Sequence, residues 1–198
     1  MKFFTQDEEN KMAAKKYALF VLSLFLLPLA GHTQDKIDGV TPGQTQEIAP
    51  ESEKRDVETY TKLIEAQNRE LLQKTQEMTA LSEDPDRDDL PKVKKLSSEI
   101  YALTEEIAKL QIGQHESLLA APELTESRRL ALQENQSILQ ESIQLIQQVK
   151  PLTDELFAES EKTSPDIKKI EDLQKKMFPL ANRLQEVGLK VQHNLMVP

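Results

Sequence analysis

Apolar residues recur every three or four positions along most of this chain, and this spacing limits its possible folds more than any other feature. From Glu53 onward the spacing places apolar side chains on one face of successive helices. An acidic turn with a proline at 83–86 and a break at 120–122 interrupt the pattern. We therefore predict an all-α fold of four helices. They would form two consecutive long hairpins, 53–121 and 122–198, in an elongated bundle or a coiled-coil-like arrangement.

The predicted second and fourth helices carry matching heptad seams, in which apolar residues alternate in steps of three and four. A shift of 77 residues superposes the two seams. The superposed pairs are Val93 with Ile170, Leu96 with Leu173, Ile100 with Met177, Leu103 with Leu180, and Ile107 with Leu184. An internal duplication of one hairpin would explain this match. Two independent amphipathic helices would also align by period alone, so both explanations stay open.

Helix-breaking residues predict where the last two helices bend and begin. Pro151 predicts that the third helix kinks or ends one residue earlier. Pro179 predicts a kink in the fourth helix. Ser164 and Pro165 predict the start of that helix, with Ser164 as its N-cap and Pro165 in its first turn.

A candidate export signal precedes the helices. Lys15 and Lys16 stand before an apolar run of 14 residues, Tyr17–Ala30. This length is typical of a signal peptide, whereas a membrane-spanning helix needs about 20 apolar residues. We predict a signal peptide at residues 1–33 and a periplasmic or secreted protein with no membrane insertion after cleavage. The alternative is an uncleaved, single N-terminal membrane anchor.

The segments around this signal are less regular. Residues 34–52 are rich in Gly, Pro, Thr and Gln without an apolar period, and they predict a flexible linker. Residues 1–11 are acidic, which is unusual before a signal peptide, and Met12 would be a more ordinary start. We interpret residues 1–11 as a candidate for a misassigned start.

Composition removes several classes of function. The absence of Cys excludes disulfides, Fe–S clusters, thiol nucleophiles and Cys-based zinc sites. The formal net charge of −9 and the lack of a basic cluster argue against binding to nucleic acid or to anionic lipid. No nucleophile motif or Gly-rich phosphate loop occurs. We therefore predict a protein that is not an enzyme and has no cofactor.

Two histidines are the weak candidates for a metal site. His115 and His193 lie near the ends of the predicted second and fourth helices, and neither has another histidine three or four residues away. The ordinary interpretation is that each complements the dipole of a helix C-terminus. We predict no metal site.

The segment Leu124-Thr125-Glu126-Ser127-Arg128 resembles the LTxxQ segment of the periplasmic helical family that includes Spy, CpxP and the zinc-resistance-associated proteins. Similar starts occur at 103–106 and 152–155, and the order of helices and turns over about residues 55–198 is also similar. Arg128 replaces the glutamine of the motif, the histidine clusters of the metal-binding members are missing, and this body is acidic. The resemblance implies an envelope-stress protein, a homodimer that shields unfolded exported polypeptides.

The sequence thus predicts an exported, chaperone-like helical protein that binds protein partners or unfolded polypeptides and forms a homo-oligomer. One alternative is a structural or adaptor coiled-coil protein of an envelope or secretion complex, and another is a metal carrier or sensor. Apolar residues off the main seams are the candidates for partner binding, with packing between the hairpins as the competing interpretation. These residues are Ile112, Leu118, Leu119, Leu130 and Met196.

Overall fold

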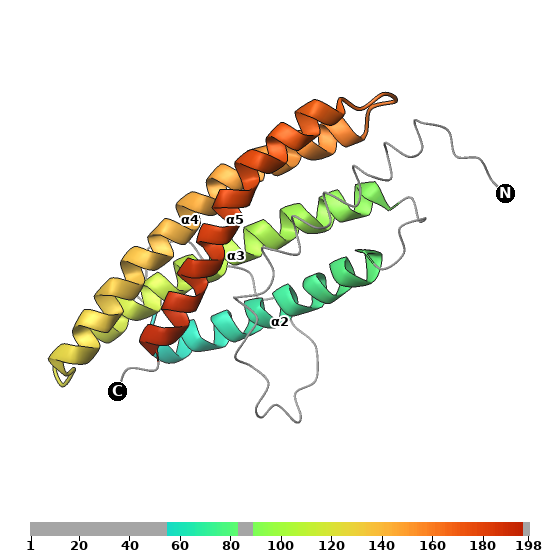
Figure 1. Cartoon of the computed structure of the whole chain (residues 1–198). Helices are drawn as coiled ribbons and strands as arrows, with labels where there is room; N and C mark the ends of the chain where they lie inside the picture. Colours follow the sequence, from blue (N-terminus) through green and yellow to red (C-terminus); the bar gives the residue numbers. More distant parts are fainter. Residues whose placement is uncertain (1–54, 83–88, 196–198) are drawn as a thin grey trace.

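The computed structural model describes residues 55–82 and 89–195, and these residues form helices without any strand. In chain order the helices are α2 (Val57–Ser82), α3 (Leu90–Leu119), α4 (Glu126–Ser160) and α5 (Ile167–Leu195). They form two hairpins, as Figure 1 shows. The predicted all-α fold is therefore confirmed. The predicted signal peptide and linker lie outside the described residues.

Three of the helices begin at a side-chain cap. Asp56 caps α2 by accepting a hydrogen bond from the backbone N–H of Thr59 at 2.7 Å. Thr125 caps α4 through the backbone N–H of Arg128. Each cap satisfies a backbone N–H that has no partner within the helix.

The cap of α5 corrects the prediction made for Ser164. Asp166, two residues later, accepts a hydrogen bond from the backbone N–H of Lys169 at 3.1 Å, and its carbonyl accepts the first helical bond. Glu159 explains this choice, because its carboxylate accepts the backbone N–H of Asp166 at 3.1 Å and an ion pair from Lys162 at 2.7 Å. These bonds fix the chain at Asp166, so the helix begins at Ile167.

The helices pack in the order of the sequence. α2 lies against α3, α3 against α4 and α4 against α5, each pair antiparallel (Figure 1). In the described part of the chain, no Cα atom of α2 comes within 8 Å of one in α4 or α5, and none of α3 does so with α5. The two hairpins therefore form an open array in which α2 and α5 are the edges.

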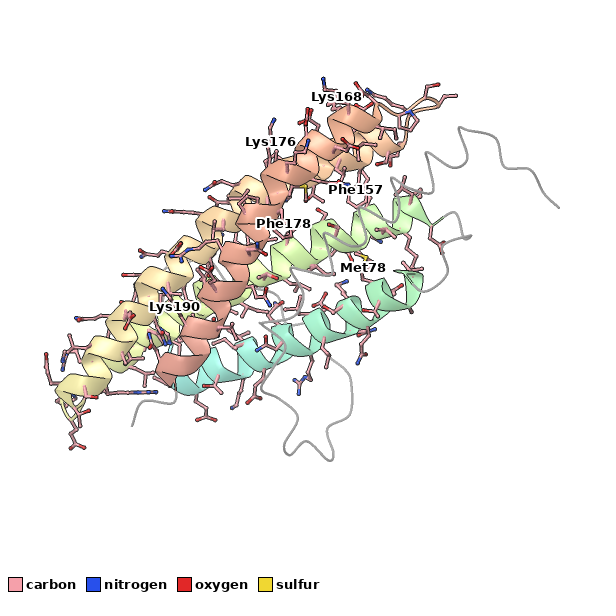
Figure 2. All side chains as sticks on the ribbon, viewed as in Figure 1. Met78, Phe157, Lys168, Lys176, Phe178 and Lys190 are labelled. Carbon is pink, nitrogen blue, oxygen red and sulfur yellow. The ribbon has the colours of Figure 1, made fainter. Side chains whose placement is uncertain are left out.

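One apolar cluster runs through the array and takes side chains from all four helices. Figure 2 shows Met78 between α2 and α3 and Phe157 on the side of α4 that faces α3. The positions superposed by the shift of 77 residues are nearly all buried. Because these seams face the core, the heptad pattern predicted the buried face of α3 and α5 correctly.

Neither proline ends its helix. α4 continues through Pro151, so the prediction that it might end there is wrong, and α5 continues through Pro179. Both prolines are exposed, so water can solvate the carbonyl left without a helical N–H four residues earlier. The ribbon of α5 changes direction near Phe178, which precedes Pro179 (Figure 2). A bend at that point is the expected consequence of a proline.

Gly113 allows α2 to approach α3 closely. A Cβ at this position would lie 2.6 Å from Oη and 2.7 Å from Cζ of Tyr60. We expect Gly113→Ala to push the Tyr60 ring outward and to lower the free energy of unfolding by about 1 kcal/mol, because overpacking outweighs the gain in helix propensity. Urea denaturation measures this change. In a Tyr60→Ala background the same substitution should instead stabilise, by about 1 kcal/mol. Equal effects in both backgrounds would contradict the contact.

Candidate functional site

The core is buried along the whole array, but apolar side chains outside it are exposed at one end. Beside the α4–α5 turn, Val93, Phe157 and Ile170 are fully buried, and so is Leu132 near the α3–α4 turn. At the α3–α4 end, Leu118 and Leu119 are only half-buried, and Leu130 is 57% exposed. We call Leu118, Leu119 and Leu130 the open end. Apolar side chains are accessible to another molecule there, as they also are at single positions on α2 and α5.

The open end is built by the turn between α3 and α4. Leu118 and Leu119 form the last turn of α3, and Leu130 follows one turn after the Thr125 cap of α4. The guanidinium of Arg129 donates a hydrogen bond to the carbonyl of Leu119 at 3.2 Å, which ties the end of α3 to the start of α4. The three leucines therefore stand on a fixed turn.

Three of the five predicted partner-binding residues thus lie at this end of the array, on either side of the α3–α4 turn. Ile112 lies about two turns earlier in α3, where it is half-buried and packs against the core cluster. Met196 lies outside the described residues. Whether any of these residues binds a partner stays a prediction.

Sequence reasoning missed three exposed apolar residues. Leu72 on α2 is 39% exposed, and Phe178 and Leu189 on α5 are 49% and 56% exposed. Phe178 and Leu189 are eleven residues apart, which is close to three full turns, so they lie on the same side of α5. That spacing is visible in the sequence. The seam hides it, because Phe178 follows the seam residue Met177 and Leu189 lies between the seam residues Val187 and Val191.

His115 is buried close to the open end and is held neutral. Its side chain is 3% exposed, and its Nδ1 atom has no hydrogen-bond partner in the structure. Burial, with a smaller contribution from the charge of Arg128, lowers the pKa of His115 to about 4. This is a core histidine rather than one exposed at a helix terminus.

The two histidines are not shown to meet. His193 lies in the last turn of α5, and its side chain is not among those described. Among the residues that the structure describes, no three His, Cys, Asp or Glu side chains are grouped so that they could hold a metal ion. Within the same residues, no helix is apolar over enough of its length to cross a membrane.

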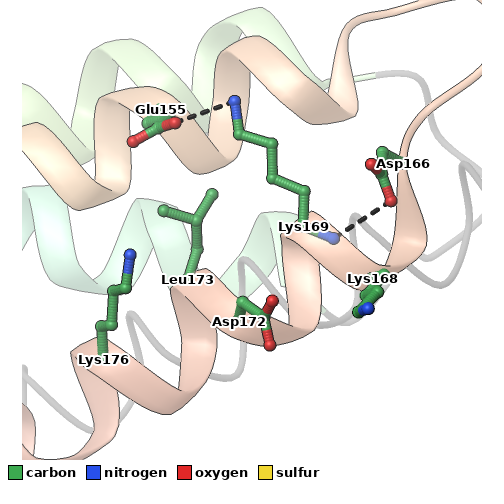
Figure 3. A pocket seen from close by; sticks show the side chains of 7 residues that line it. All are labelled: Glu155, Asp166, Lys168, Lys169, Asp172, Leu173 and Lys176. Atoms are coloured by element: carbon green, nitrogen blue, oxygen red, sulfur yellow. Dashed lines mark hydrogen bonds and ion pairs between the residues drawn. The ribbon is translucent and has the colours of Figure 1, made fainter.

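A pocket of about 240 Å³ lies at the start of α5, between α5 and the end of α4 (Figure 3). Three lysines and three carboxylates line it together with Leu173, so their charges balance. Two of these residues, Lys169 and Glu155, form an ion pair at 2.8 Å, and Asp166 is used as the helix cap. The lining residues are Glu155, Asp166, Lys168, Lys169, Asp172, Leu173 and Lys176. Asp172 pairs with Lys175 at 3.4 Å, so each of the three carboxylates already has a partner, and we assign no ligand to this pocket.

Comparisons with protein-family models, with curated proteins and with solved structures found no match to this chain. The arguments about function therefore depend on the residues of this chain.

The buried His115 makes stability depend on pH. Its folded pKa of about 4 lies below the ordinary value of 6.5, so the unfolded chain binds the proton more readily. Stability from this group is complete above pH 6.5 and is lost as the pH falls from 6.5 to 4. We expect a loss of about 2 kcal/mol at pH 4.5, measured by urea denaturation.

The variant His115→Leu isolates this effect, because it keeps an apolar side chain of similar size and removes the titrating ring. Its stability should fall less than that of the parent chain between pH 7 and pH 4.5. Identical pH slopes for the two chains would show that folding does not change the pKa of His115.

Proposed function

We propose that this chain is an exported helical binding protein that holds segments of other exported polypeptides loosely, in the manner of an envelope chaperone. The observation that carries the proposal is the open end, where Leu130 is the most exposed large apolar side chain in the described part of the chain. Two further leucines are half-buried beside it. Such a small apolar surface on an acidic, soluble frame suits transient contact with apolar segments.

The size of the open end favours weak binding. Full burial of a leucine side chain contributes about 1.5 to 3 kcal/mol. Because Leu130 is 57% exposed and Leu118 and Leu119 are less exposed, covering all three would contribute roughly 1 to 4 kcal/mol. That corresponds to a dissociation constant of about 1 mM or weaker. An affinity of this order lets a client bind and leave repeatedly, as a holding function requires.

Charged residues around the open end would limit what stays bound. Arg128 and Arg129 lie directly before Leu130, and Glu126 lies in the first turn of the same helix. Glu126 is exposed and stays in water when an apolar segment covers the leucines, so it helps to keep the complex soluble, while Arg129 remains bonded to Leu119. Both signs of charge are present, so the surface does not select strongly for the charge of a client.

We expect Leu130→Glu to weaken the suppression of aggregation of an unfolded exported protein at least twofold, because a carboxylate would be buried under the client. Light scattering of the aggregating client measures this. Gln140→Glu is the matched control, since Gln140 is an exposed residue of the same helix about three turns away. Equal suppression by both variants would remove the open end from the proposed function.

Crosslinking in the native host tests the function itself. Mass spectrometry of proteins attached to the tagged chain should find many exported proteins, each in small amount. One abundant envelope protein would instead support the dedicated adaptor, which is the alternative proposal. The heptad seams of α3 and α5 favour that alternative less, because they are buried in the core of this chain.

A metal carrier or sensor is the third possibility from the sequence. It would have to bind zinc or copper tightly through His115 and His193. The buried, neutral His115 has one ring nitrogen without a hydrogen-bond partner. This is the single observation that supports a metal-binding function. Binding of zinc that is lost in His115→Leu would revive this function.

A further inference from the structure

The contact between α3 and α4 changes from apolar to polar as it approaches the open end. On α3 the core face continues from Ile107 through Gln111 to His115, each four residues after the last. On α4 the core face includes Asn135, and both Asn135 and His115 are buried. Polar side chains therefore take core positions in the part of the array that lies beside the open end.

His115 and Asn135 lie at about the same height in the array. Arg129 donates a hydrogen bond to the carbonyl of Leu119 at 3.2 Å, which sets the height of α4 against α3 at this end. Because the two helices are antiparallel, His115, four residues before Leu119, lies opposite a residue about four positions after Arg129. Asn135 is six positions after Arg129, so it is offset from His115 by roughly 3 Å along the helices.

This polar part of the contact holds three buried atoms without a hydrogen-bond partner in the structure. They are Nδ1 of His115, Oδ1 of Asn135 and Oε1 of Gln111. A buried polar atom that is left unpaired costs stability, and water can pair with it once the contact opens. The contact between α3 and α4 is therefore weaker here than an apolar layer of the same size would be.

His115 also lies on the same face of α3 as two leucines of the open end. Leu118 and Leu119 follow it by three and four residues, and these steps place side chains next to one another on a helix. The ends of helices open at a lower free energy than their centres. A change at His115 therefore acts on the layer of the core that opens most easily.

The surroundings of His115 oppose a positive charge on its ring. An imidazolium donates from both ring nitrogens, and Nδ1 has no acceptor here. Arg128 of α4, the described charged group that acts on the ring, is itself positive. The other charged groups at this height on the four helices are exposed, and they are Asp56, Glu58, Glu116, Glu134 and Lys190. Because water screens exposed charges, these groups compensate little for a charge inside the contact.

We propose that protonation of His115 opens the α3–α4 end of the array and thereby enlarges the open end. In the closed array Leu132 is buried, and Leu118 and Leu119 are partly covered. Separation of the end of α3 from the start of α4 would expose all three side chains beside Leu130. This inference rests on the proposed function, because it makes the holding of clients depend on pH.

The expected size of the effect follows from the two environments of His115. Its pKa is about 4 in the closed array and takes the ordinary value of 6.5 in water. The opened state binds the proton more readily, so opening becomes more favourable as the pH falls from 6.5 to 4. Between pH 7 and pH 5 the ratio of opened to closed chains should rise about twentyfold.

Hydrogen exchange of the full chain at pH 7 and pH 5, measured by mass spectrometry, tests the opening. After correction for the pH dependence of exchange itself, amides in 112–118 and 131–136 should lose about twentyfold in protection. At both pH values they should be less protected than amides in 93–101, because they exchange through the opening of one end. Equal protection of the two regions at pH 5 would show that exchange needs unfolding of the whole chain, which would overturn the proposal.

Two leucine variants assign the effect to one histidine. His115→Leu should abolish the loss of protection, because leucine keeps the position apolar and does not titrate. His193→Leu is the matched control, since it removes the same ring from the last turn of α5, and it should keep the loss. A loss that persists in His115→Leu would overturn the proposal, and so would one that disappears in both variants.

A binding assay connects the opening with the proposed function. The probe is a labelled peptide of leucine and serine with blocked ends, whose own charge does not change with pH, and fluorescence anisotropy measures its binding. The parent chain should bind it at least twofold more tightly at pH 5 than at pH 7, whereas His115→Leu should bind it equally. Equal binding by the parent chain at both pH values would overturn this inference and leave the proposed function. No binding at either pH would refute the proposed function, while hydrogen exchange would still decide whether the end opens.

Discussion

The packing of α3 against α4 is the contact on which the rest of the structure depends, because among the described residues it is the one helix pair that joins the two hairpins. Within it lies a buried polar pair, Tyr101 and Thr153, with the two hydroxyl oxygens 3.0 Å apart. Thr153 donates its proton to the carbonyl of Val149 at 3.1 Å, so Tyr101 must be the donor between them. Burial raises the pKa of Tyr101 and keeps its proton in place.

That pair also fixes the register of the two hairpins. A hydroxyl left without a partner at this depth would cost about 1 to 3 kcal/mol, so a shift of α4 along α3 is penalised even though the apolar surfaces could slide. Further ion pairs lie at the rim of the same contact, such as Lys94 with Glu161 at 3.0 Å. They are exposed and contribute little to stability, but their geometry agrees with the same register.

The sequence predicted which residues face the core better than it predicted which helices meet. The heptad steps in 93–107 and 170–184 report the buried face directly, because burial follows the period of the helix. The same period does not show which flank of a helix packs against a neighbouring helix. That is why Leu72, Phe178 and Leu189 were missed as surface candidates.

Local chemistry set the remaining limits of prediction. Ser164 and Asp166 are both good caps, and residues next to them in sequence cannot decide between them. The decision comes from Glu159, whose carboxylate bonds to the N–H of Asp166 and pairs with Lys162 and Lys169. Likewise, Pro151 and Pro179 stop a helix only where the freed carbonyl is buried, and both are exposed here.

The exposed apolar residues of this chain differ in how they are grouped. The open end has three leucines on one fixed turn, so the number of apolar contacts that it can offer is small. Leu72 stands alone on α2, and Phe178 and Leu189 are three turns apart on α5. Scattered apolar residues are normal on the surface of a folded protein, whereas neighbouring ones can contact the same bound segment. This difference favours the turn between α3 and α4 over the edge helices as the place where a client is held.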